Sequence, residues 1–137
     1  TFGICLGLQL LFTESEEFEN CKGLDLIKGK IKKFKPSSIQ YKVPQIAWNQ
    51  ISYPNKMTIN NSPLNKINEG EYMYFVHSFY AAPENQDIVL TETNYSGITY
   101  CSGILKNNIF AVQFHPEKSG KKGLEIYQNW AIINNLT

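Results

Sequence analysis

Gly3-Ile4-Cys5-Leu6-Gly7 has the form G-x-C-x-G, and apolar residues at helical spacing follow it directly. This order is typical of a strand, a sharp turn and a helix that together expose a nucleophile, here with a thiol in place of a serine hydroxyl. Such a turn requires strained backbone angles and little side-chain bulk on either side, which the two glycines allow. The simpler interpretation is a small buried cysteine in a glycine-rich turn. This stretch alone leaves both interpretations open.

The expected position of Cys5 also bears on its reactivity. A thiol at the N-terminus of a helix faces unpaired backbone N–H groups and the positive end of the helix dipole, so we expect the pKa of Cys5 to fall from about 8.5 toward neutrality. The backbone N–H of Leu6 is expected to point to where an oxyanion would form. The apolar spacing predicts a helix from residue 5 to about residue 18, with its end near Ser15, because the glutamates there oppose the dipole at a helix C-terminus.

A second candidate segment, Gln113-Phe114-His115-Pro116-Glu117, ends a predicted strand. Pro116 favours an extended conformation for His115, and residues two apart in an extended segment point the same way. The Glu117 carboxylate can therefore orient the His115 ring, which can take a proton from a thiol, as in a Cys–His–acid triad. Alone, the segment could be a strand-end turn with a solvated carboxylate. Together with G-x-C-x-G, it favours nucleophilic catalysis.

The rest of the chain predicts a layered α/β fold. Runs rich in β-branched and aromatic residues predict strands at residues 30–35, 43–51, 72–80, 88–95, 98–105 and 109–114. Pro36-Ser37-Ser38 closes the first of these strands, and a brief helix is possible at residues 60–64. The short turn Lys106-Asn107-Asn108 makes the last two strands an antiparallel hairpin. Helical spacing returns from Gly123, so we expect a mixed sheet with an antiparallel middle, packed against helices.

Composition excludes several classes of protein. The chain has 137 residues, of which 42% are hydrophobic, and this suits one globular domain at residues 1–137. Its net charge of +1 does not indicate binding to nucleic acid or to an anionic membrane. The lysines at residues 30–35 are then the solvated face of a strand rather than a nucleic-acid patch. Three cysteines, Cys5, Cys21 and Cys101, suit a reducing cytoplasm and lack metal-ligand spacing. The histidines are His77 and His115, so imidazole chemistry must use one of them.

Three stretches together resemble the class I (triad-type) glutamine amidotransferases. They are Gly3-Ile4-Cys5-Leu6-Gly7-Leu8-Gln9, Phe75-Val76-His77-Ser78, and Val112-Gln113-Phe114-His115-Pro116-Glu117-Lys118-Ser119-Gly120. Within this family the chain is most similar to the glutaminase subunits of imidazole glycerol phosphate synthase. The cues for that subgroup are residues 23–29, Val43-Pro44 followed by Trp48-Asn49, the Tyr-x-Tyr-Phe-Val-His run, and Gly123-Leu124.

The resemblance implies a fold, a site and partners. The fold would be a flavodoxin-like mixed sheet flanked by helices, of which this chain is the C-terminal two-thirds and lacks the N-terminal strands. Cys5, His115 and Glu117 would form the catalytic triad, without a metal or an organic cofactor. Trp48 and Asn49 would lie at the interface with a cyclase subunit, which forms a heterodimer with the glutaminase and receives its ammonia. Residues that would hold the substrate L-glutamine are Leu6, Gln9, Glu17, His77, Ser78 and Phe79. His77 could equally be a core histidine of its aromatic strand.

Two departures from the family pattern stand out. Gln45-Ile46-Ala47 replaces the usual His-Met-Gly before Trp-Asn, which affects the segment expected to face the partner. Family members also carry further sequence before the turn, which would supply the first strands and the second oxyanion donor. We therefore expect Gly3 to lack a leading strand, the sheet to have an unpaired edge, and this chain alone to be inactive and poorly soluble.

The predicted reaction is hydrolysis of glutamine to glutamate and ammonia, with the ammonia used to make imidazole glycerol phosphate in histidine biosynthesis. A paralogous glutaminase that supplies a sugar-amidating synthetase is one alternative. A non-catalytic amidotransferase-like binding module is another, although the intact triad residues speak against it. A Cys–His peptidase shares the chemistry but not the glutaminase-like stretches around both residues.

Overall fold

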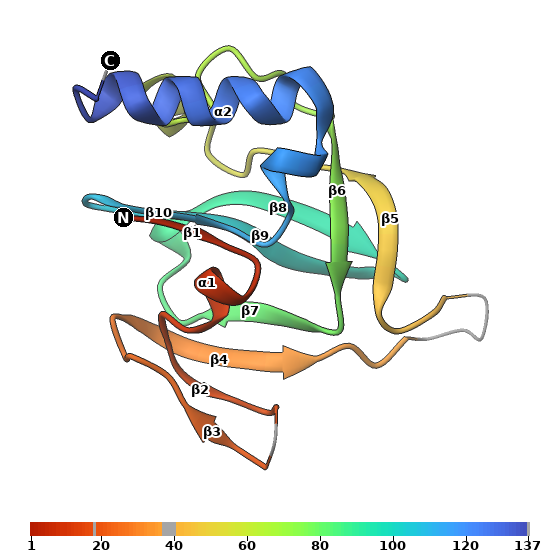
Figure 1. The fold of residues 1–137 in the computed structure, drawn as a ribbon. Coiled ribbons are helices and arrows are strands. Elements are labelled where there is room, and N and C mark those ends of the chain that lie inside the picture. The colour runs from red at the N-terminus through yellow and green to blue at the C-terminus, as the bar shows by residue number, and fades with distance from the viewer. Residues whose placement is uncertain (18, 37–40, 137) are drawn as a thin grey trace.

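The computed structural model describes residues 1–17, 19–36 and 41–136, so Phe18, Ser37 and Ser38 lie outside the described residues. Within these ranges two α-helices accompany the strands, with three short 3-10 turns between them (Figure 1). The elements in chain order are β1 (Phe2–Ile4), α1 (Leu6–Gln9), β2 (Phe12–Ser15), β3 (Cys21–Lys22), β4 (Ile27–Lys33), β5 (Gln45–Gln50), η1 (Lys56–Asn61), β6 (Tyr72–His77), β7 (Phe79–Pro83), η2 (Gln86–Ile88), β8 (Val89–Tyr95), β9 (Ile98–Lys106), β10 (Ile109–Val112), η3 (Pro116–Lys118) and α2 (Gly120–Ile133).

The main sheet is mixed, as predicted. Its order within the described residues is β1-β10-β9-β7-β4-β2-β3, and β8 pairs with β9 beside this path. The β1–β10 and β2–β4 pairs are parallel, whereas the central pairs from β10 to β4 are antiparallel. The predicted hairpin of β9 and β10 is confirmed. The expectation that no strand leads into Gly3 is wrong, because β1 pairs with β10; β1 does lie at one end of the described strand order.

Two apolar cores lie on opposite faces of this sheet. Side chains alternate between faces along a strand, and β10 contributes Phe110 and Val112 to one core but Ala111 to the other. Helix α2 covers the first core through Ile126, and α1 covers the second through Leu8. Figure 1 shows α2 above β1 and β10 and α1 below them. The prediction of a mixed sheet flanked by helices is therefore confirmed.

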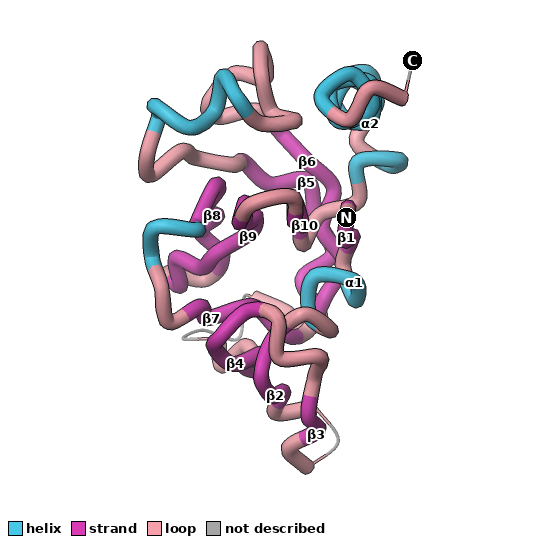
Figure 2. The backbone as a smooth tube through the Cα atoms, turned by 90° about the vertical axis from the view of Figure 1, so that its left-hand side faces the viewer, coloured by secondary structure: helices cyan, strands magenta, loops and turns pink. Residues whose placement is uncertain are grey.

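Strands β5 and β6 form a separate antiparallel ribbon, which pairs Gln45 with His77 at one end and Gln50 with Tyr72 at the other. The predicted single strand at residues 72–80 is wrong, because the chain leaves the ribbon at Ser78 and enters the main sheet as β7. Figure 1 shows the ribbon at the right of the main sheet, and Figure 2, seen from the left-hand side of Figure 1, shows it behind β10.

The predicted long helix after Cys5 is also wrong. Helix α1 ends at Gln9, and residues Phe12–Ser15 form strand β2. Carbonyl groups that a longer helix would have used internally accept hydrogen bonds from a later loop: Leu24 donates to Leu10, and Leu26 and Ile27 both donate to Leu11. Tertiary hydrogen bonds and burial of Phe12 in the second core therefore outweigh the helical spacing of this stretch.

The other predicted strands lie within a few residues of their expected positions, whereas β3, η2 and η3 have no predicted counterpart. The brief helix considered at residues 60–64 lies earlier, as the 3-10 helix η1, and the Asn55 side chain caps it by accepting a hydrogen bond from the Met57 N–H. Helix α2 begins at Gly120, three residues before Gly123, and Gly120 itself has a left-handed φ of 67°.

Candidate active site

Cys5 occupies a strained turn between β1 and α1, as the G-x-C-x-G pattern predicts. Its φ of 51° and ψ of −105° lie outside the regions that L-residues favour, at a cost of roughly 1–3 kcal/mol. A Cβ atom on Gly3 would lie 3.0 Å from the Gly7 carbonyl oxygen and 3.1 Å from the Ala111 Cβ. A Cβ atom on Gly7 would meet nothing within 4 Å. The steric requirement for glycine therefore holds at Gly3 and not at Gly7.

The pairing of β1 with β10 brings the two predicted catalytic segments together. These strands are parallel and in register from Phe2 with Phe110 to Ile4 with Val112, so their carboxyl ends meet at one edge. The Cys5 N–H continues the pairing with a 2.9 Å hydrogen bond to the Val112 carbonyl. Residues that follow Ile4 and residues that follow Val112 therefore emerge side by side, although they are far apart in the sequence.

His115 and Glu117 contact each other directly. His115 Nδ1 lies 2.6 Å from Glu117 Oε1, and the Tyr127 hydroxyl on α2 donates to Glu117 Oε2 at 3.3 Å. Burial acts to raise the pKa of Glu117, but hydrogen bonds from His115 and Tyr127 outweigh it and hold the pKa below its ordinary value. The Ser119 hydroxyl donates to the His115 carbonyl at 2.6 Å and steadies the turn.

The Cys5 sulfur and the His115 backbone both contact strand β6. Sγ of Cys5 lies 3.9 Å from the Val76 carbonyl oxygen, and the His115 N–H donates to the Tyr74 carbonyl at 3.0 Å. These two carbonyls are two residues apart, a rise of about 7 Å along a strand, so the Cys5 sulfur and the His115 backbone lie against the same short stretch of β6. Among the described residues no hydrogen bond joins the sulfur to the imidazole. The two residues therefore approach the same strand, and their direct contact stays a prediction.

The expected low pKa of Cys5 is not found. Burial raises the pKa of the thiol, and it outweighs hydrogen bonds from the Leu6 backbone N–H and the Gln113 side-chain amide, which lower it. The negative charge of Glu117 raises it further. Helix α1 has four residues, too few for a substantial dipole, so desolvation dominates. A base must therefore remove the thiol proton before the sulfur can attack.

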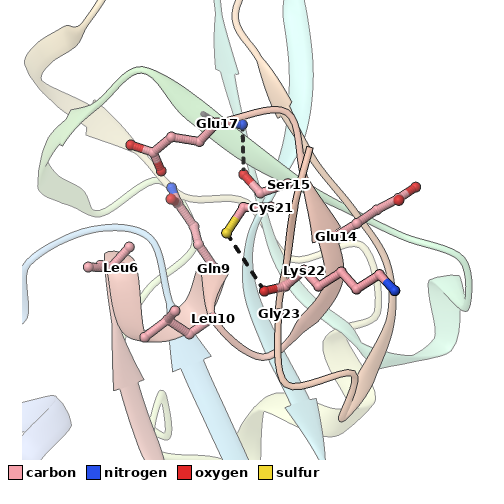
Figure 3. A pocket seen from close by; sticks show the side chains of 9 residues that line it. All are labelled: Leu6, Gln9, Leu10, Glu14, Ser15, Glu17, Cys21, Lys22 and Gly23. Atoms are coloured by element: carbon pink, nitrogen blue, oxygen red, sulfur yellow. Dashed lines mark hydrogen bonds between the residues drawn. The ribbon is translucent and has the colours of Figure 1, made fainter. Parts of the chain in front are cut away.

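A hollow of about 80 Å³ lies beside α1. Three of the residues expected to hold substrate are in its wall: Leu6, Gln9 and Glu17. Figure 3 shows the side chains of Gln9 and Glu17 directed toward one another, with Leu6 and Leu10 below them. The remaining lining residues are Glu14, Ser15, Cys21, Lys22 and Gly23.

Gln9 links this hollow to the residues after β6 and β10. Its Nε2 donates to the Phe79 carbonyl at 3.2 Å and to Gln113 Oε1 at 3.1 Å. The Phe79 carbonyl also accepts from His77 Nδ1 at 2.7 Å. Ser78 lies between His77 and Phe79 in the sequence, and its carbonyl accepts a hydrogen bond from the Phe34 N–H.

His77 is a buried histidine, and its ring lies in the aromatic core beside Phe34 and Phe75. Burial lowers its pKa to about 4, so the ring is neutral at pH 7. With the proton on Nδ1, facing the Phe79 carbonyl, its Nε2 faces the Tyr100 hydroxyl at 3.2 Å. These contacts favour the core interpretation of His77, with an indirect effect on the site through Phe79.

The expected partner residues lie on opposite faces of the ribbon. Trp48 is 53% exposed and packs edge-on against Tyr74 at 5.9 Å, whereas Asn49 Nδ2 donates to the Asn94 carbonyl at 2.8 Å. Of the residues that depart from the family pattern, Ile46 is exposed. Gln45 is fully buried and accepts from the Tyr100 hydroxyl at 3.0 Å, so its side chain belongs to the core rather than to an outer face.

Gln113 was not predicted as a site residue. Its Nε2 lies 3.5 Å from the Cys5 sulfur, and its side chain is fully buried. The signal was available in the sequence, because Gln113 and His115 are two residues apart in an extended segment and so share a face.

The described residues offer neither a metal site nor a membrane-spanning helix. They contain no group of three or more His, Cys, Asp or Glu side chains able to hold a metal ion. None of their helices is long and apolar enough to cross a membrane.

The sequence of residues 1–134 matches the family described as "Glutamine amidotransferase class-I". A curated relative from Chlorobaculum tepidum, "Imidazole glycerol phosphate synthase subunit HisH", is 46% identical over 130 residues, which cover 94% of this chain and 61% of the relative. The subunit of the same name from Pyrococcus furiosus is 43% identical over 128 residues, which cover 93% of this chain and 62% of that relative. The chain thus spans about three-fifths of the length of these relatives.

A solved structure shows the same fold at lower identity. A chain in the structure of PurLQS from Thermotoga maritima matches with a TM-score of 0.64 and 22% identity, over 99% of this chain and 61% of that one.

Proposed function

This chain belongs to the class I glutamine amidotransferases, and from that premise we propose that it carries the glutaminase centre of an imidazole glycerol phosphate synthase. The reaction is hydrolysis of L-glutamine to glutamate and ammonia, and the ammonia serves histidine biosynthesis. Cys5 is the nucleophile, His115 the base and Glu117 the residue that orients the base. The observation that carries the proposal is the meeting of the Cys5 turn and the His115–Glu117 pair at the carboxyl ends of paired parallel strands.

The reaction proceeds by acyl transfer in two steps. His115 takes the Cys5 proton, the sulfur attacks the side-chain amide carbon of glutamine, and the proton passes to the leaving ammonia. Water, deprotonated by His115, then attacks the thioester carbon, and the tetrahedral intermediate collapses to glutamate as the Cys5 sulfur leaves and takes the proton back from His115. Glu117 stabilises the charged imidazole in both steps. The Leu6 N–H, which already bonds the sulfur, is one donor for the oxyanion.

Substrate recognition uses the hollow beside α1. The Glu17 carboxylate can accept hydrogen bonds from the α-ammonium group of glutamine, and the exposed side of Leu6 can cover its methylene groups. Gln9 and the backbone of Ser78 and Phe79 border the same region, and His77 fixes that backbone from inside. No organic cofactor is required by this chemistry.

The partner is a cyclase subunit, which forms a heterodimer with this protein. The names of the relatives support this assignment, and they favour it over a sugar-amidating synthetase. Trp48 offers a large exposed aromatic surface on the ribbon, the type of residue that often anchors an interface. We place the protein in the cytoplasm, because its three cysteines are unpaired.

Two measurements test the proposal. A glutamine-like diazoketone should modify Cys5 and not the exposed Cys21, and glutamine should slow the modification. Glutamate release should be fast with a cyclase subunit present and absent in Cys5→Ala. A chain extended to the length of its relatives should be assayed in parallel, because we expect the 137-residue chain alone to be inactive. Modification of Cys21 but not Cys5, in the extended chain, would instead indicate a non-catalytic binding module.

A further inference from the structure

We propose that Gln113 is a positioning residue for the nucleophile, and that its side-chain amide, held by Gln9, stabilises the Cys5 sulfur as a thiolate. The inference rests on the proposed glutaminase function, since it assigns Gln113 a part in that reaction. It is based on two consecutive side-chain hydrogen bonds, from Gln9 to Gln113 and from Gln113 to the Cys5 sulfur, which together form a relay from the substrate hollow.

The relay fixes which end of the Gln113 amide faces the sulfur. Gln9 Nε2 donates to Gln113 Oε1 at 3.1 Å, and Gln113 Nε2 lies 3.5 Å from Sγ of Cys5. Because an amide nitrogen is a donor and cannot accept, Gln9 must meet the oxygen of Gln113, and the nitrogen must then face the sulfur. A donor aimed at sulfur favours the thiolate, which accepts hydrogen bonds more strongly than the thiol.

Both ends of the relay are anchored. The Gln113 side chain is fully buried, and its backbone N–H donates to the Ser102 carbonyl at 2.9 Å. Gln9 also donates to the Phe79 carbonyl at 3.2 Å, so its amide cannot rotate without loss of that bond. Gln113 therefore presents its N–H group in a fixed direction, and no reorganisation is needed when the sulfur loses its proton.

The electrostatics of Cys5 make this donor important. Burial and the charge of Glu117 both raise the pKa of the thiol, and the Leu6 backbone N–H and the Gln113 amide oppose them. A backbone donor remains in any variant, so Gln113 is the side chain whose removal tests the effect. Loss of a hydrogen bond to a charged group is expected to raise the Cys5 pKa by about one unit, which is a tenfold loss of thiolate at neutral pH.

The test measures the Cys5 pKa from the pH dependence of iodoacetamide alkylation. The Cys21→Ser background is used because Cys21 is exposed, whereas Cys101 is buried and its pKa is raised to about 12. Gln113→Met removes the hydrogen bonds with little change in size. Gln113→Glu keeps the acceptor for Gln9 and loses the donor, and its negative charge beside the sulfur should raise the Cys5 pKa further, so Gln113→Met is the variant that isolates the donor. The experiment uses the chain extended to the length of its relatives, with the cyclase subunit for turnover.

Both Gln113 variants should raise the Cys5 pKa by about one unit or more, and kcat should fall about tenfold with little change in KM. Gln45→Met is the matched control, since Gln45 is equally buried but bonds Tyr100 and not the sulfur; its Cys5 pKa should stay at the wild-type value. Gln9→Met removes the residue that holds Gln113 and should also raise the Cys5 pKa. Because Gln9 is half-buried, this variant can test the inference even if the Gln113 variants fold poorly.

An unchanged Cys5 pKa in Gln113→Met and Gln113→Glu, or in Gln9→Met where those two cannot be folded, would overturn the inference. An equal shift in Gln45→Met would do the same, because it would indicate a general effect on the core. The proposed function fails in a different way, by absence of glutamate release from the wild-type protein. Alkylation still reports on Gln113 in that case.

Discussion

His115 Nδ1 and Glu117 Oε1 lie 2.6 Å apart, in residues separated by Pro116 alone. The proline keeps His115 extended, with φ −103° and ψ 96°, and begins the turn η3 that brings Glu117 back toward the ring. Tyr127 reaches from α2 to the second carboxylate oxygen at 3.3 Å. The pair is therefore set by a local sequence signal and then held by a contact with a distant helix.

Glu117→Gln should lower kcat for glutamine hydrolysis by about 10²- to 10⁴-fold with a small effect on KM. The amide keeps the shape of the carboxylate but cannot stabilise a protonated imidazole, and it can favour the wrong tautomer. Steady-state glutamate release measures the effect. Glu125→Gln is the matched control, because Glu125 pairs with Lys122 on α2 and does not contact His115. A variant that retains more than half of the wild-type kcat would contradict the role given to Glu117.

Gly3→Ala should lower the free energy of unfolding by about 1–3 kcal/mol. Its new Cβ would press against the Gly7 carbonyl oxygen and the Ala111 side chain, and neither can move without displacing β10 or the start of α1. Urea unfolding measures the loss. Gly7→Ala is the control from the same motif: nothing lies within 4 Å of its Cβ, and alanine suits a helix, so its stability should equal or exceed that of the wild type. Equal losses in the two variants would refute this explanation of the motif.

The sequence predicted what is local and missed what depends on distant pairing. The Cys5 turn, the His115–Glu117 pair and the β9–β10 hairpin each follow from a few adjacent residues, and all were found. The parallel pairing of β1 with β10 was not predicted, because the two strands are far apart in the sequence and neither stretch contains a signal for its partner. Strand β2 was read as helix for the same reason, since its carbonyl partners lie in a later loop.

The chemistry of the site likewise divides into local features, which the sequence predicts, and long-range features, which it does not. Helix position suggested a low pKa for Cys5, but burial, which depends on the whole fold, raises it. Gln113 lies within a stretch that was identified, yet its importance comes from Gln9, which arrives from a different element. Interactions of this kind depend on how distant elements pack in the folded chain.

Stability should fall as the pH is lowered from about 6.5 to 4, and His77 should account for much of the loss. Its pKa is about 4 in the folded protein and near 6.5 in an unfolded chain, so the unfolded chain binds the proton first. The stability is complete above pH 6.5 and is lost progressively below it, by about 3 kcal/mol at pH 4. Urea unfolding at several pH values measures this slope. His77→Gln should flatten it between pH 6.5 and 4, and an identical slope in that variant would exclude His77 as the cause.

Trp48→Ala should weaken binding of the cyclase subunit by tenfold or more and leave the free energy of unfolding nearly unchanged. The Trp48 side chain is half exposed and packs edge-on against Tyr74 rather than within the core, so about half of its surface is available to a partner. Burial of a large aromatic side chain at the centre of an interface contributes on the order of 2 kcal/mol or more, whereas the same residue at a rim contributes little. Titration calorimetry with the cyclase subunit measures the affinity. Leu124→Ala, at an equally exposed position on α2, controls for loss of apolar surface in general and should bind normally. If the two variants bind equally well, the ribbon is not the docking face, and the exposure of Trp48 needs another explanation.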